Sequence, residues 1–286
     1  MNQALDNKKI AFVGAGAMAE AIIRGLVQQP ELKPEQIFAT NRSNSARLAE
    51  LAKYGIRASN DPETKAAAIR EADIVVIAFK PKDAAEGLKQ IRDLLSPRQL
   101  LVSVIAGLSI GTIARQVPAG MPIVRTMPNT SSSIGLGVTG IAFPDGISEQ
   151  DKAAALAMFR AVGEVYEVPE HQINWIVGLS GSGPAYVYYF IEAMVEAGVR
   201  GGLSPQMAKE LVVQTVLGAA NMVKQTGTEP AVLRKQVTSP GGTTEAAIRT
   251  LAERHFQEAM LDAINRCVER ADEIGRALDD SILSDD

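Results

Sequence analysis

Short apolar-rich runs alternate with segments of helical spacing over the first 167 residues. Between the runs, segments such as 45–53 and 149–162 have the periodicity of amphipathic helices. Short apolar runs of this kind are typical of strands buried on both faces of a parallel sheet. The alternation predicts a Rossmann-type α/β domain over residues 1–167, doubly wound around a mostly parallel sheet. The runs are Lys8–Val13, Gln36–Thr40, Ala72–Phe79, Leu100–Ile105, Pro122–Met127, Val138–Phe143 and Glu164–Val168.

The pattern becomes helical after Pro169. Ser182-Gly183-Pro184 and Ser204-Pro205 are helix-start signals. Further helices are predicted at 244–252 and 256–278, and the acidic tail 279–286 is expected to fray. Frequent Ala and Gly on these helices permit close packing, and so small and apolar a segment is expected to complete its core against a second subunit. Residues 168–286 are therefore predicted to form an all-α substrate-binding and dimerisation domain.

The composition is that of an ordinary globular protein. The 286 residues are 46% hydrophobic and 22% charged, with a net charge of −4, so no electrostatic feature favours nucleic acid or an anionic membrane. There is no signal-peptide pattern and no apolar run of bilayer length, which predicts a cytoplasmic protein. One cysteine and two widely separated histidines predict that no metal is bound.

The first run leads directly into Gly14-Ala15-Gly16-Ala17-Met18-Ala19 and then a helical pattern. This is G-x-G-x-x-A in the strand–turn–helix context that binds a dinucleotide. In such a loop Gly14 permits the tight turn and Gly16 lets the backbone approach a pyrophosphate. The sequence predicts a dinucleotide site that includes Met18 at the start of the helix.

The residues after the second run bear on the choice of cofactor. NAD-selective folds usually place an acid there for the ribose 2′-hydroxyl, whereas this chain has Asn41-Arg42-Ser43. An arginine fork beside hydroxyl and amide donors suits a 2′-phosphate, so we expect NADPH, with NADH as a weaker cofactor. The alternative is that Arg42 is a solvated surface residue and Ser43 caps the next helix.

Other strand ends contribute candidate cofactor contacts, because the carboxyl ends of parallel strands face the ligand crevice. Lys80 could act there or could simply be a solvated strand end. The candidates are Asn60, Ala78, Phe79, Lys80, Pro81, Ala106, Gly107 and Asn129.

Residues 236–247 form a second candidate site. Pro240-Gly241-Gly242 cannot continue a helix, yet helical spacing flanks it and resumes near Thr243-Thr244. A helix start offers unpaired N–H groups and a positive dipole end to a carboxylate or phosphate. The alternative is an ordinary turn with Thr243 as the helix N-cap.

Three stretches together resemble the pyrroline-5-carboxylate reductase family. They are Gly14–Ala19, Leu179–Tyr186 (Leu-Ser-Gly-Ser-Gly-Pro-Ala-Tyr) and Val237–Thr244 (Val-Thr-Ser-Pro-Gly-Gly-Thr-Thr). The resemblance covers essentially the whole chain. It implies NAD(P)H-dependent reduction of L-1-pyrroline-5-carboxylate to L-proline, the last step of proline biosynthesis. It also implies a homodimer through the C-terminal helices and a larger homo-oligomer, with a decamer among the candidates.

The resemblance also implies roles for residues. Thr244 matches the hydroxyl that hydrogen-bonds the substrate's ring nitrogen, and the amides of Gly242, Thr243 and Thr244, next to Gly241, match the carboxylate site. Ser239 matches a position near cofactor and substrate. Phe79 stands where many members have a small aliphatic residue. Glu245 would repel a substrate carboxylate, so we expect it to point away.

Two other classes compete with this interpretation. β-Hydroxyacid dehydrogenases resemble the chain in domain order but use a lysine on an early helix of the second domain, and residues 179–200 contain none. A non-catalytic NADP-binding regulator would need the dinucleotide loop but no second anion site beside Thr244.

Overall fold

The computed structural model describes residues 3–42 and 44–283. Contacts group the chain into two compact units. The first unit comprises residues 1–182 and 267–286, and the second comprises residues 183–266. The last helix contributes to both units, so the first unit is built from two separate parts of the chain.

The first unit contains an eight-stranded sheet in the order β3-β2-β1-β4-β5-β6-β7-β8. Neighbouring strands are parallel except β6 and β7, which are antiparallel. This order confirms the predicted doubly wound, mostly parallel sheet. The strands are β1 Ile10–Val13, β2 Ile37–Thr40, β3 Arg57–Ala58, β4 Ile74–Ile77, β5 Leu100–Ser103, β6 Ile123–Met127, β7 Gly137–Ala142 and β8 Gly163–Glu167.

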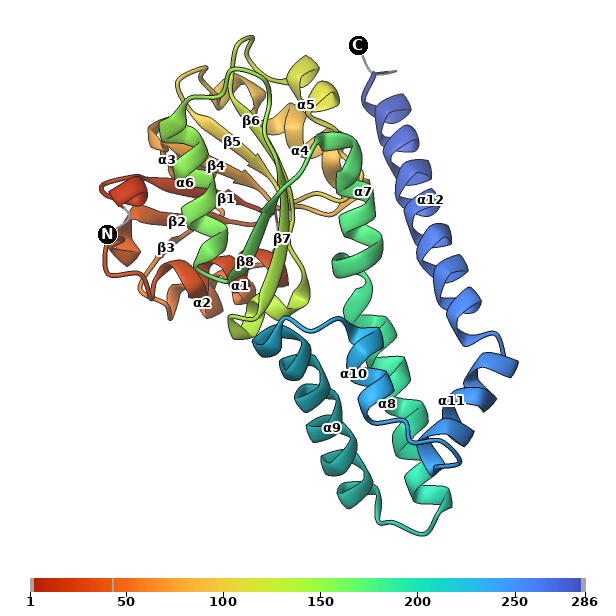
Figure 1. Ribbon diagram of the computed structural model, residues 1–286. Helices are drawn as coiled ribbons and strands as arrows, with labels where there is room; N and C mark the ends of the chain where they lie inside the picture. The colour runs from red at the N-terminus through yellow and green to blue at the C-terminus, as the bar shows by residue number, and fades with distance from the viewer. Residues whose placement is uncertain (1–2, 43, 284–286) are drawn as a thin grey trace. The chain divides into compact units, whose positions relative to one another are not determined.

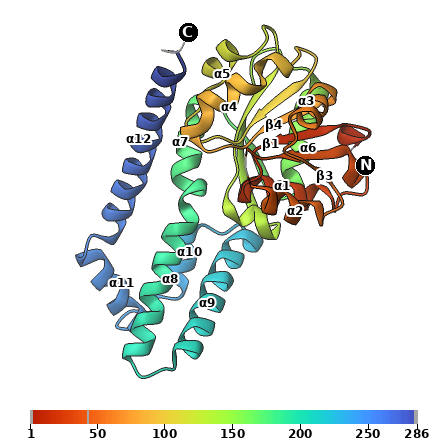
Figure 2. The same ribbon diagram turned by 180° about the vertical axis from the view of Figure 1, so that it is seen from behind.

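Two apolar cores lie on the two faces of this sheet, because successive strand residues point to opposite sides. Phe12 belongs to one core, together with residues of α1 (Ala17–Leu26), α2 (Ser45–Ala52) and α6 (Glu149–Arg160). Val13 belongs to the other core. That core includes residues of α3 (Pro62–Glu71), α4 (Ala84–Ile91) and α5 (Ile110–Gln116). Figures 1 and 2 show from opposite sides how helices cover the two faces of the sheet.

The last helix, α12 (Phe256–Leu283), continues beyond its predicted end. Leu278 and Ile282 are buried in the second core of the sheet, and Asp279 accepts a hydrogen bond from Thr112. The prediction of a frayed tail is therefore wrong for residues 279–283, because Leu278 and Ile282 extend the apolar helix face by one turn. Residues 284–286 lie outside the described part of the chain.

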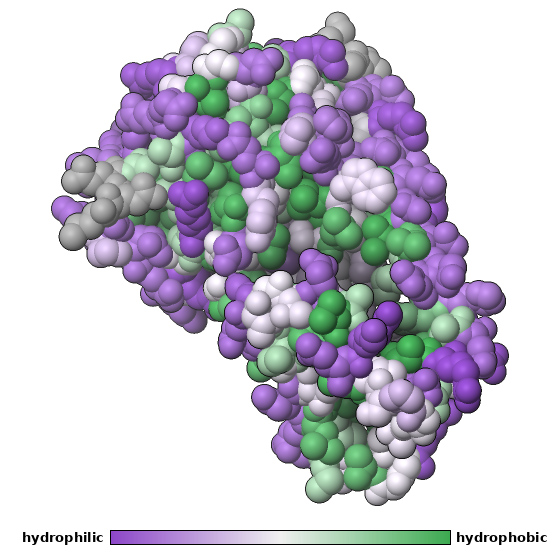
Figure 3. All heavy atoms as spheres, in the orientation of Figure 1, coloured by the Kyte–Doolittle hydropathy of each residue, from purple (hydrophilic) through white to green (hydrophobic). Residues whose placement is uncertain are grey.

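The second unit consists of helices. The turn between α8 and α9 is tight: a Cβ on Gly198 would lie 3.1 Å from the Cβ of Ala208. Ser204 caps α9 by accepting from the Met207 N–H. Large hydrophobic side chains remain at the surface of these helices, and Figure 3 shows some of them on the face in view. The unit contains α8 Gly183–Arg200, α9 Pro205–Thr226, α10 Pro230–Gln236, α11 Thr243–Glu253 and the first part of α12.

Short helical segments complete the first unit. A short α-helix, α7 (Ile173–Ile176), leads into a π-helical turn at Val177–Gly181. The 3₁₀ turns are Gln3–Leu5, Pro34–Gln36, Pro81–Asp83, Arg92–Leu94, Thr130–Ile134 and Glu170–Gln172. Within residues 3–42 and 44–283, no helix combines the length and the hydropathy needed to cross a membrane.

Candidate cofactor cavity and substrate loop

A cavity of about 380 Å³ opens at the carboxyl ends of β1, β2 and β4. Here the strand order reverses direction, which is where doubly wound sheets bind ligands. Eight predicted cofactor contacts line it: Gly14, Ala15, Gly16, Asn41, Arg42, Ala78, Phe79 and Lys80. Residues from three separate turns are thus brought to one cavity.

The β1–α1 loop has the geometry that an anion needs. Gly14 has φ +105°, and a Cβ there would lie 2.6 Å from the carbonyl carbon of Ala78, so a side chain cannot be accommodated. At Gly16 a Cβ would meet nothing within 4 Å. Gly16 is the N-cap of α1, with no side-chain cap, and Ala17 and Met18 follow it as the first helical residues. The loop therefore presents open N–H groups at a helix start and fits a pyrophosphate.

The charges around the cavity are mixed. Arg42 lines it beside the lysines Lys65, Lys80 and Lys82, but its Nη1 lies 3.6 Å from Asp83 Oδ1. An acidic side chain from the turn after β4 is thus paired with the arginine that follows β2. Sequence reasoning missed Asp83 because it lies about 40 positions further along the chain.

The structure identifies the residue that caps the start of α2. Asn44 is the N-cap, and its Oδ1 accepts from the Arg47 N–H at 3.0 Å. The alternative that Ser43 caps this helix is therefore wrong. Ser43 itself, a predicted cofactor contact, lies outside the described residues.

Several predicted contacts do not line this cavity. Asn60 donates to Ser45 Oγ, at 3.3 Å. Asn129 donates to the Ser180 carbonyl and accepts from the Val138 N–H, which ties two chain segments together. Ala106 and Gly107 follow β5, and Pro81 begins the 3₁₀ turn after β4.

Phe79, the unusual residue at this edge, is accommodated by a glycine. Its ring packs over Gly87 of α4, where a Cβ would lie 2.7 Å from the ring. Gly87 also lines the cavity. The large Phe79 side chain thus fits because Gly87, which faces it, has no side chain.

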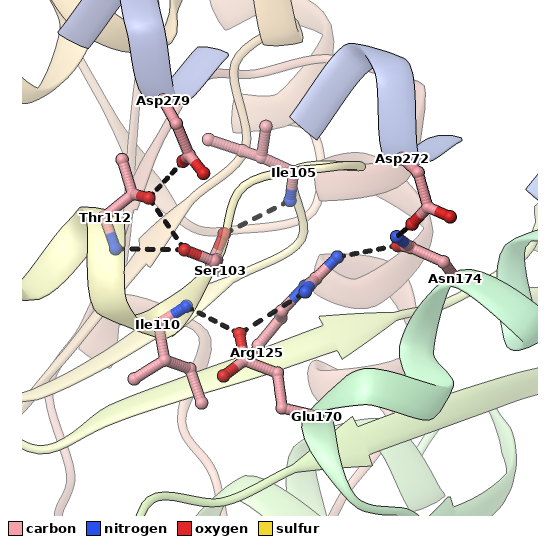
Figure 4. A network of polar contacts seen from close by, with 10 residues as sticks. Ser103, Ile105, Ile110, Thr112, Arg125, Glu170, Asn174, Asp272 and Asp279 are labelled. Atoms are coloured by element: carbon pink, nitrogen blue, oxygen red, sulfur yellow. Dashed lines mark hydrogen bonds and ion pairs between the residues drawn. The ribbon is translucent and has the colours of Figure 1, made fainter. Parts of the chain in front are cut away.

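A polar network around the buried Arg125 side chain lies beside the β5–α5 loop (Figure 4). The Arg125 side chain is 7% exposed; it donates to Glu170 at 3.3 Å and to Asn174 at 2.9 Å. Asn174 in turn donates to Asp272 of α12. Burial lowers the pKa of the Arg125 guanidinium, and the charge of Glu170 opposes that shift. The network fixes the second half of α12 within the first unit.

Close backbone packing supports the same contact. Gly107 has φ +81°, and a Cβ on it would lie 3.2 Å from the Gly275 nitrogen of α12. Glycine is needed on both sides of this approach, because a Cβ on Gly275 would lie 2.9 Å from the Gly107 carbonyl oxygen.

The candidate substrate loop lies in the second unit, between α10 and α11. Gly241 has φ +72°, and the Gly242 N–H donates to the Ser239 carbonyl at 3.0 Å. Gly242 is the extended N-cap of α11 and provides no side-chain cap, so the alternative of Thr243 as N-cap is wrong. Among the described residues no acceptor is found for the N–H groups of Thr243 and Thr244. Of the three backbone amides predicted to bind the carboxylate, the Gly242 N–H is therefore already hydrogen-bonded, and those of Thr243 and Thr244 are available for a ligand.

Glu245 is tied to the loop itself. Its Oε2 accepts from the Gly241 N–H at 2.7 Å. The carboxylate thereby satisfies a donor in the Gly-rich turn and sits in the first turn of α11, where the helix dipole favours it. Its orientation relative to a substrate stays a prediction.

The remaining chemistry-bearing residues are not clustered. Cys267 is half-buried, and its thiol donates to Ser182 Oγ at 3.2 Å. Within the described part of the chain, no three His, Cys, Asp or Glu side chains gather in a way that could hold a metal ion.

Comparisons with known proteins match both parts of the chain. Residues 170–274 match the family described as pyrroline-5-carboxylate reductase dimerisation, and residues 9–107 match NADP oxidoreductase, coenzyme F420-dependent. Pyrroline-5-carboxylate reductase 2 of Bacillus subtilis is 44% identical over 93% of this chain and 95% of the relative.

Solved structures agree. A pyrroline-5-carboxylate reductase from Coxiella burnetii has a TM-score of 0.84 at 37% identity, covering 94% of this chain and 99% of its own. The Plasmodium falciparum pyrroline carboxylate reductase, solved with NADP bound, has a TM-score of 0.84 at 31% identity, with the same coverage.

Proposed function

The chain belongs to the pyrroline-5-carboxylate reductase family, and from that premise we propose how its residues divide the work. It is an oxidoreductase that reduces 1-pyrroline-5-carboxylate to proline with NAD(P)H, in proline biosynthesis. Membership of the family removes the hydroxyacid dehydrogenase and the regulator as alternatives. The assignment of individual residues is the proposal.

The cofactor is held by the first unit in this proposal. The N–H groups at the start of α1 bind the pyrophosphate, and the open space at Gly16 lets the backbone approach it. Asn41 and Arg42, with Ser43, bind the 2′-phosphate, which gives the preference for NADPH over NADH. The strand ends at residues 78–81 and 106–107, with Asn60 and Asn129, make the remaining contacts. When bound, the reduced nicotinamide supplies the hydride that converts the C=N carbon of the substrate to CH₂.

The substrate is bound by the loop before α11. The open N–H groups of Thr243 and Thr244 and the positive end of the helix bind its carboxylate, and Gly241 and Gly242 let it approach closely. Thr244 Oγ1 hydrogen-bonds the ring nitrogen, and Ser239 lies nearby. Because the nitrogen of a cyclic imine is readily protonated, these groups act by positioning and electrostatics.

One observation carries this assignment. α11 begins with an extended glycine N-cap that provides no side-chain acceptor, directly after a turn whose own donors at Gly241 and Gly242 are satisfied. Among the described residues, no acceptor is found for the Thr243 and Thr244 N–H groups at the helix start. That start is where the carboxylate binds in our proposal.

The test compares two threonines of the same helix. Thr244→Val should lower kcat/KM for pyrroline-5-carboxylate about 100-fold, as the loss of a transition-state hydrogen bond does, and leave the NADPH Kd unchanged. Thr250→Val is the matched control, because that hydroxyl donates to the Ala246 carbonyl within the helix. Equal turnover by Thr244→Val and wild type would contradict the role of Thr244.

The assembly is also part of the proposal. The dimerisation-family match supports oligomerisation, and we assign a homodimer to the C-terminal helices, with further assembly up to a decamer. The functional division after residue 167 is supported by the start of that match at residue 170. A cytoplasmic location stays a prediction from composition.

A further inference from the structure

We propose that Arg47 is a positioning residue for the cofactor's pyrophosphate, acting through the backbone of the Gly14–Ala17 loop. The inference rests on the proposed cofactor site. Arg47 lies in the first turn of α2 and does not line the cavity. Its contacts with the loop are hydrogen bonds to backbone carbonyls, so in this proposal it acts through the peptide groups and not on the cofactor directly.

Arg47 binds two successive carbonyl groups of the loop. Its Nε donates to the Ala15 carbonyl at 3.0 Å, and Nη2 donates to the Gly16 carbonyl at 3.4 Å. The described chain contains no cis peptide bond. In a planar trans peptide the C=O and N–H groups point in opposite directions. The Gly16 carbonyl also accepts the first hydrogen bond of α1, from the Glu20 N–H at 3.0 Å. Arg47 thus helps to hold both carbonyls on its own side, and the N–H groups of Gly16 and Ala17 point away from it.

The guanidinium is itself held by two carboxylates, and one of these, Glu20, is held in turn by a tyrosine. Nη2 lies 2.5 Å from Glu20 Oε2, Nη1 lies 3.0 Å from Glu50, and the Tyr54 hydroxyl donates to Glu20 at 3.0 Å. The Arg47 side chain is only 20% exposed. Two carboxylates offset its charge, so its effect on a bound anion comes from orienting peptides more than from net charge. Only the planar five-donor fork of arginine can satisfy this set.

Arg42 and Arg47 thus act on different parts of the cofactor. Arg42 lines the cavity and is proposed for the 2′-phosphate, whereas Arg47 orients donors for the pyrophosphate. Fragments of the cofactor separate these roles. ADP-ribose carries the pyrophosphate without a 2′-phosphate, and 2′-AMP carries the 2′-phosphate without a pyrophosphate.

The experiment measures the Kd of NADPH, ADP-ribose and 2′-AMP for the full-length protein and its variants. Arg47→Met should weaken NADPH and ADP-ribose about 10-fold and leave 2′-AMP within about twofold, by the cost of misaligned donors to a charged group. Arg47→Lys, which keeps the charge but not the fork, should weaken ADP-ribose several-fold. Lys53→Met, at the exposed end of the same helix, is the matched control and should change none of the three.

The result that overturns the inference is equal ADP-ribose affinity of the folded variants and wild type. An equal loss of 2′-AMP affinity would also overturn it, because Arg47 would then act through its charge. If Arg47→Met does not fold, as judged by circular dichroism, Arg47→Lys decides by the same criterion. A wild-type protein that binds neither NADPH nor ADP-ribose would instead remove the proposed cofactor site, which is a distinct outcome.

Discussion

The two compact units differ in how they bury their apolar side chains. The first has a core on each face of its sheet. In the second, α8, α10 and α11 have no buried residue, and α9 buries Ala208 and Val212. Large hydrophobic side chains stay exposed there instead: Val187, Tyr188, Tyr189, Phe190, Val199, Leu203, Met207, Leu211, Val213, Leu217, Met222, Val232, Val237, Leu251, Phe256 and Leu261.

The first unit thus has a core of its own, although it also exposes Ile134 and Leu136, whereas the second unit leaves most of its large apolar side chains uncovered. So much exposed apolar surface marks a protein-binding face, and the family match names this region for dimerisation. The stability of the second unit should depend on protein concentration, whereas that of the first should not.

The largest effect is therefore expected on dilution. When the protein concentration is lowered from about 1,000 times the dimer Kd to below that Kd, the helices of the second unit should lose stability. Their free energy of protection from hydrogen exchange should fall by about 4 kcal/mol. The strands β1, β4 and β5 should keep theirs, because both faces of the sheet are covered within one chain. Hydrogen-exchange mass spectrometry at several concentrations measures both. Protection of α8 and α9 that is independent of concentration would contradict the comparison.

A matched pair of leucines tests the same contrast locally. Leu26→Ala, at a fully buried position of α1, should lower the free energy of unfolding by about 3 kcal/mol at any protein concentration. Leu217→Ala, at a 49% exposed position of α9, should cost less, and only at concentrations where the oligomer forms. Urea titrations at high and low concentration measure both. A concentration-independent cost at Leu217 would show that the second unit stabilises itself.

The sequence predicted the elements of both units better than their contacts. Periodicity placed seven of the eight strands and the helices α8, α9 and α11 within a few residues, because burial on one or both faces leaves a local signature. It missed β3, whose two residues are too few to show a pattern. It also placed Gly14 and Arg42 at one cavity, since strand ends share an edge.

Long-range pairs left no such signal. Three contacts join residues that are far apart in the chain: the ion pair of Asp83 with Arg42, the hydrogen bond from Arg47 to the Ala15 carbonyl, and the hydrogen bond from Thr112 to Asp279. A charged residue in a helix looks the same in the sequence whether it faces solvent or a backbone carbonyl. Such partners appear only once the fold has brought them together.

α12 belongs to both units, and we expect the Arg125 network to anchor its second half in the first unit. A substitution of Arg125 tests this. Arg125→Met should lower the free energy of unfolding by about 2 kcal/mol, because its charged hydrogen bonds to Glu170 and Asn174 are lost. Amide exchange should rise in residues 267–283 more than in α8 or α9. Arg115→Met, at an exposed position of α5, is the control and should be neutral. Unchanged exchange in the second half of α12 would contradict this anchoring.

A smaller effect is expected on the cofactor cavity of the first unit. Asp83→Asn removes the carboxylate 3.6 Å from Arg42 Nη1, so a 2′-phosphate no longer competes with it for the guanidinium. The ratio of kcat/KM for NADPH to that for NADH should rise about fivefold, which is about 1 kcal/mol. Arg42→Met should lower that ratio. A ratio unchanged by Asp83→Asn would show that the ion pair does not affect the choice of cofactor.

The smallest effect depends on pH and also belongs to the first unit. Hydrogen bonds from Arg47, and then from Tyr54, lower the pKa of Glu20 below its ordinary value of 4.5. A lowered carboxylate pKa contributes stability that is fully present above pH 4.5 and is lost as pH falls through the folded-state pKa. Glu20→Gln should therefore lower the free energy of unfolding by at most about 1 kcal/mol at pH 7, since the pair is partly exposed. The difference from wild type should shrink steadily below pH 4.5, as urea titrations at pH 7 and at about pH 3 would measure. A difference that stays constant with pH would mean that Glu20 contributes through packing and not through the charge of its carboxylate.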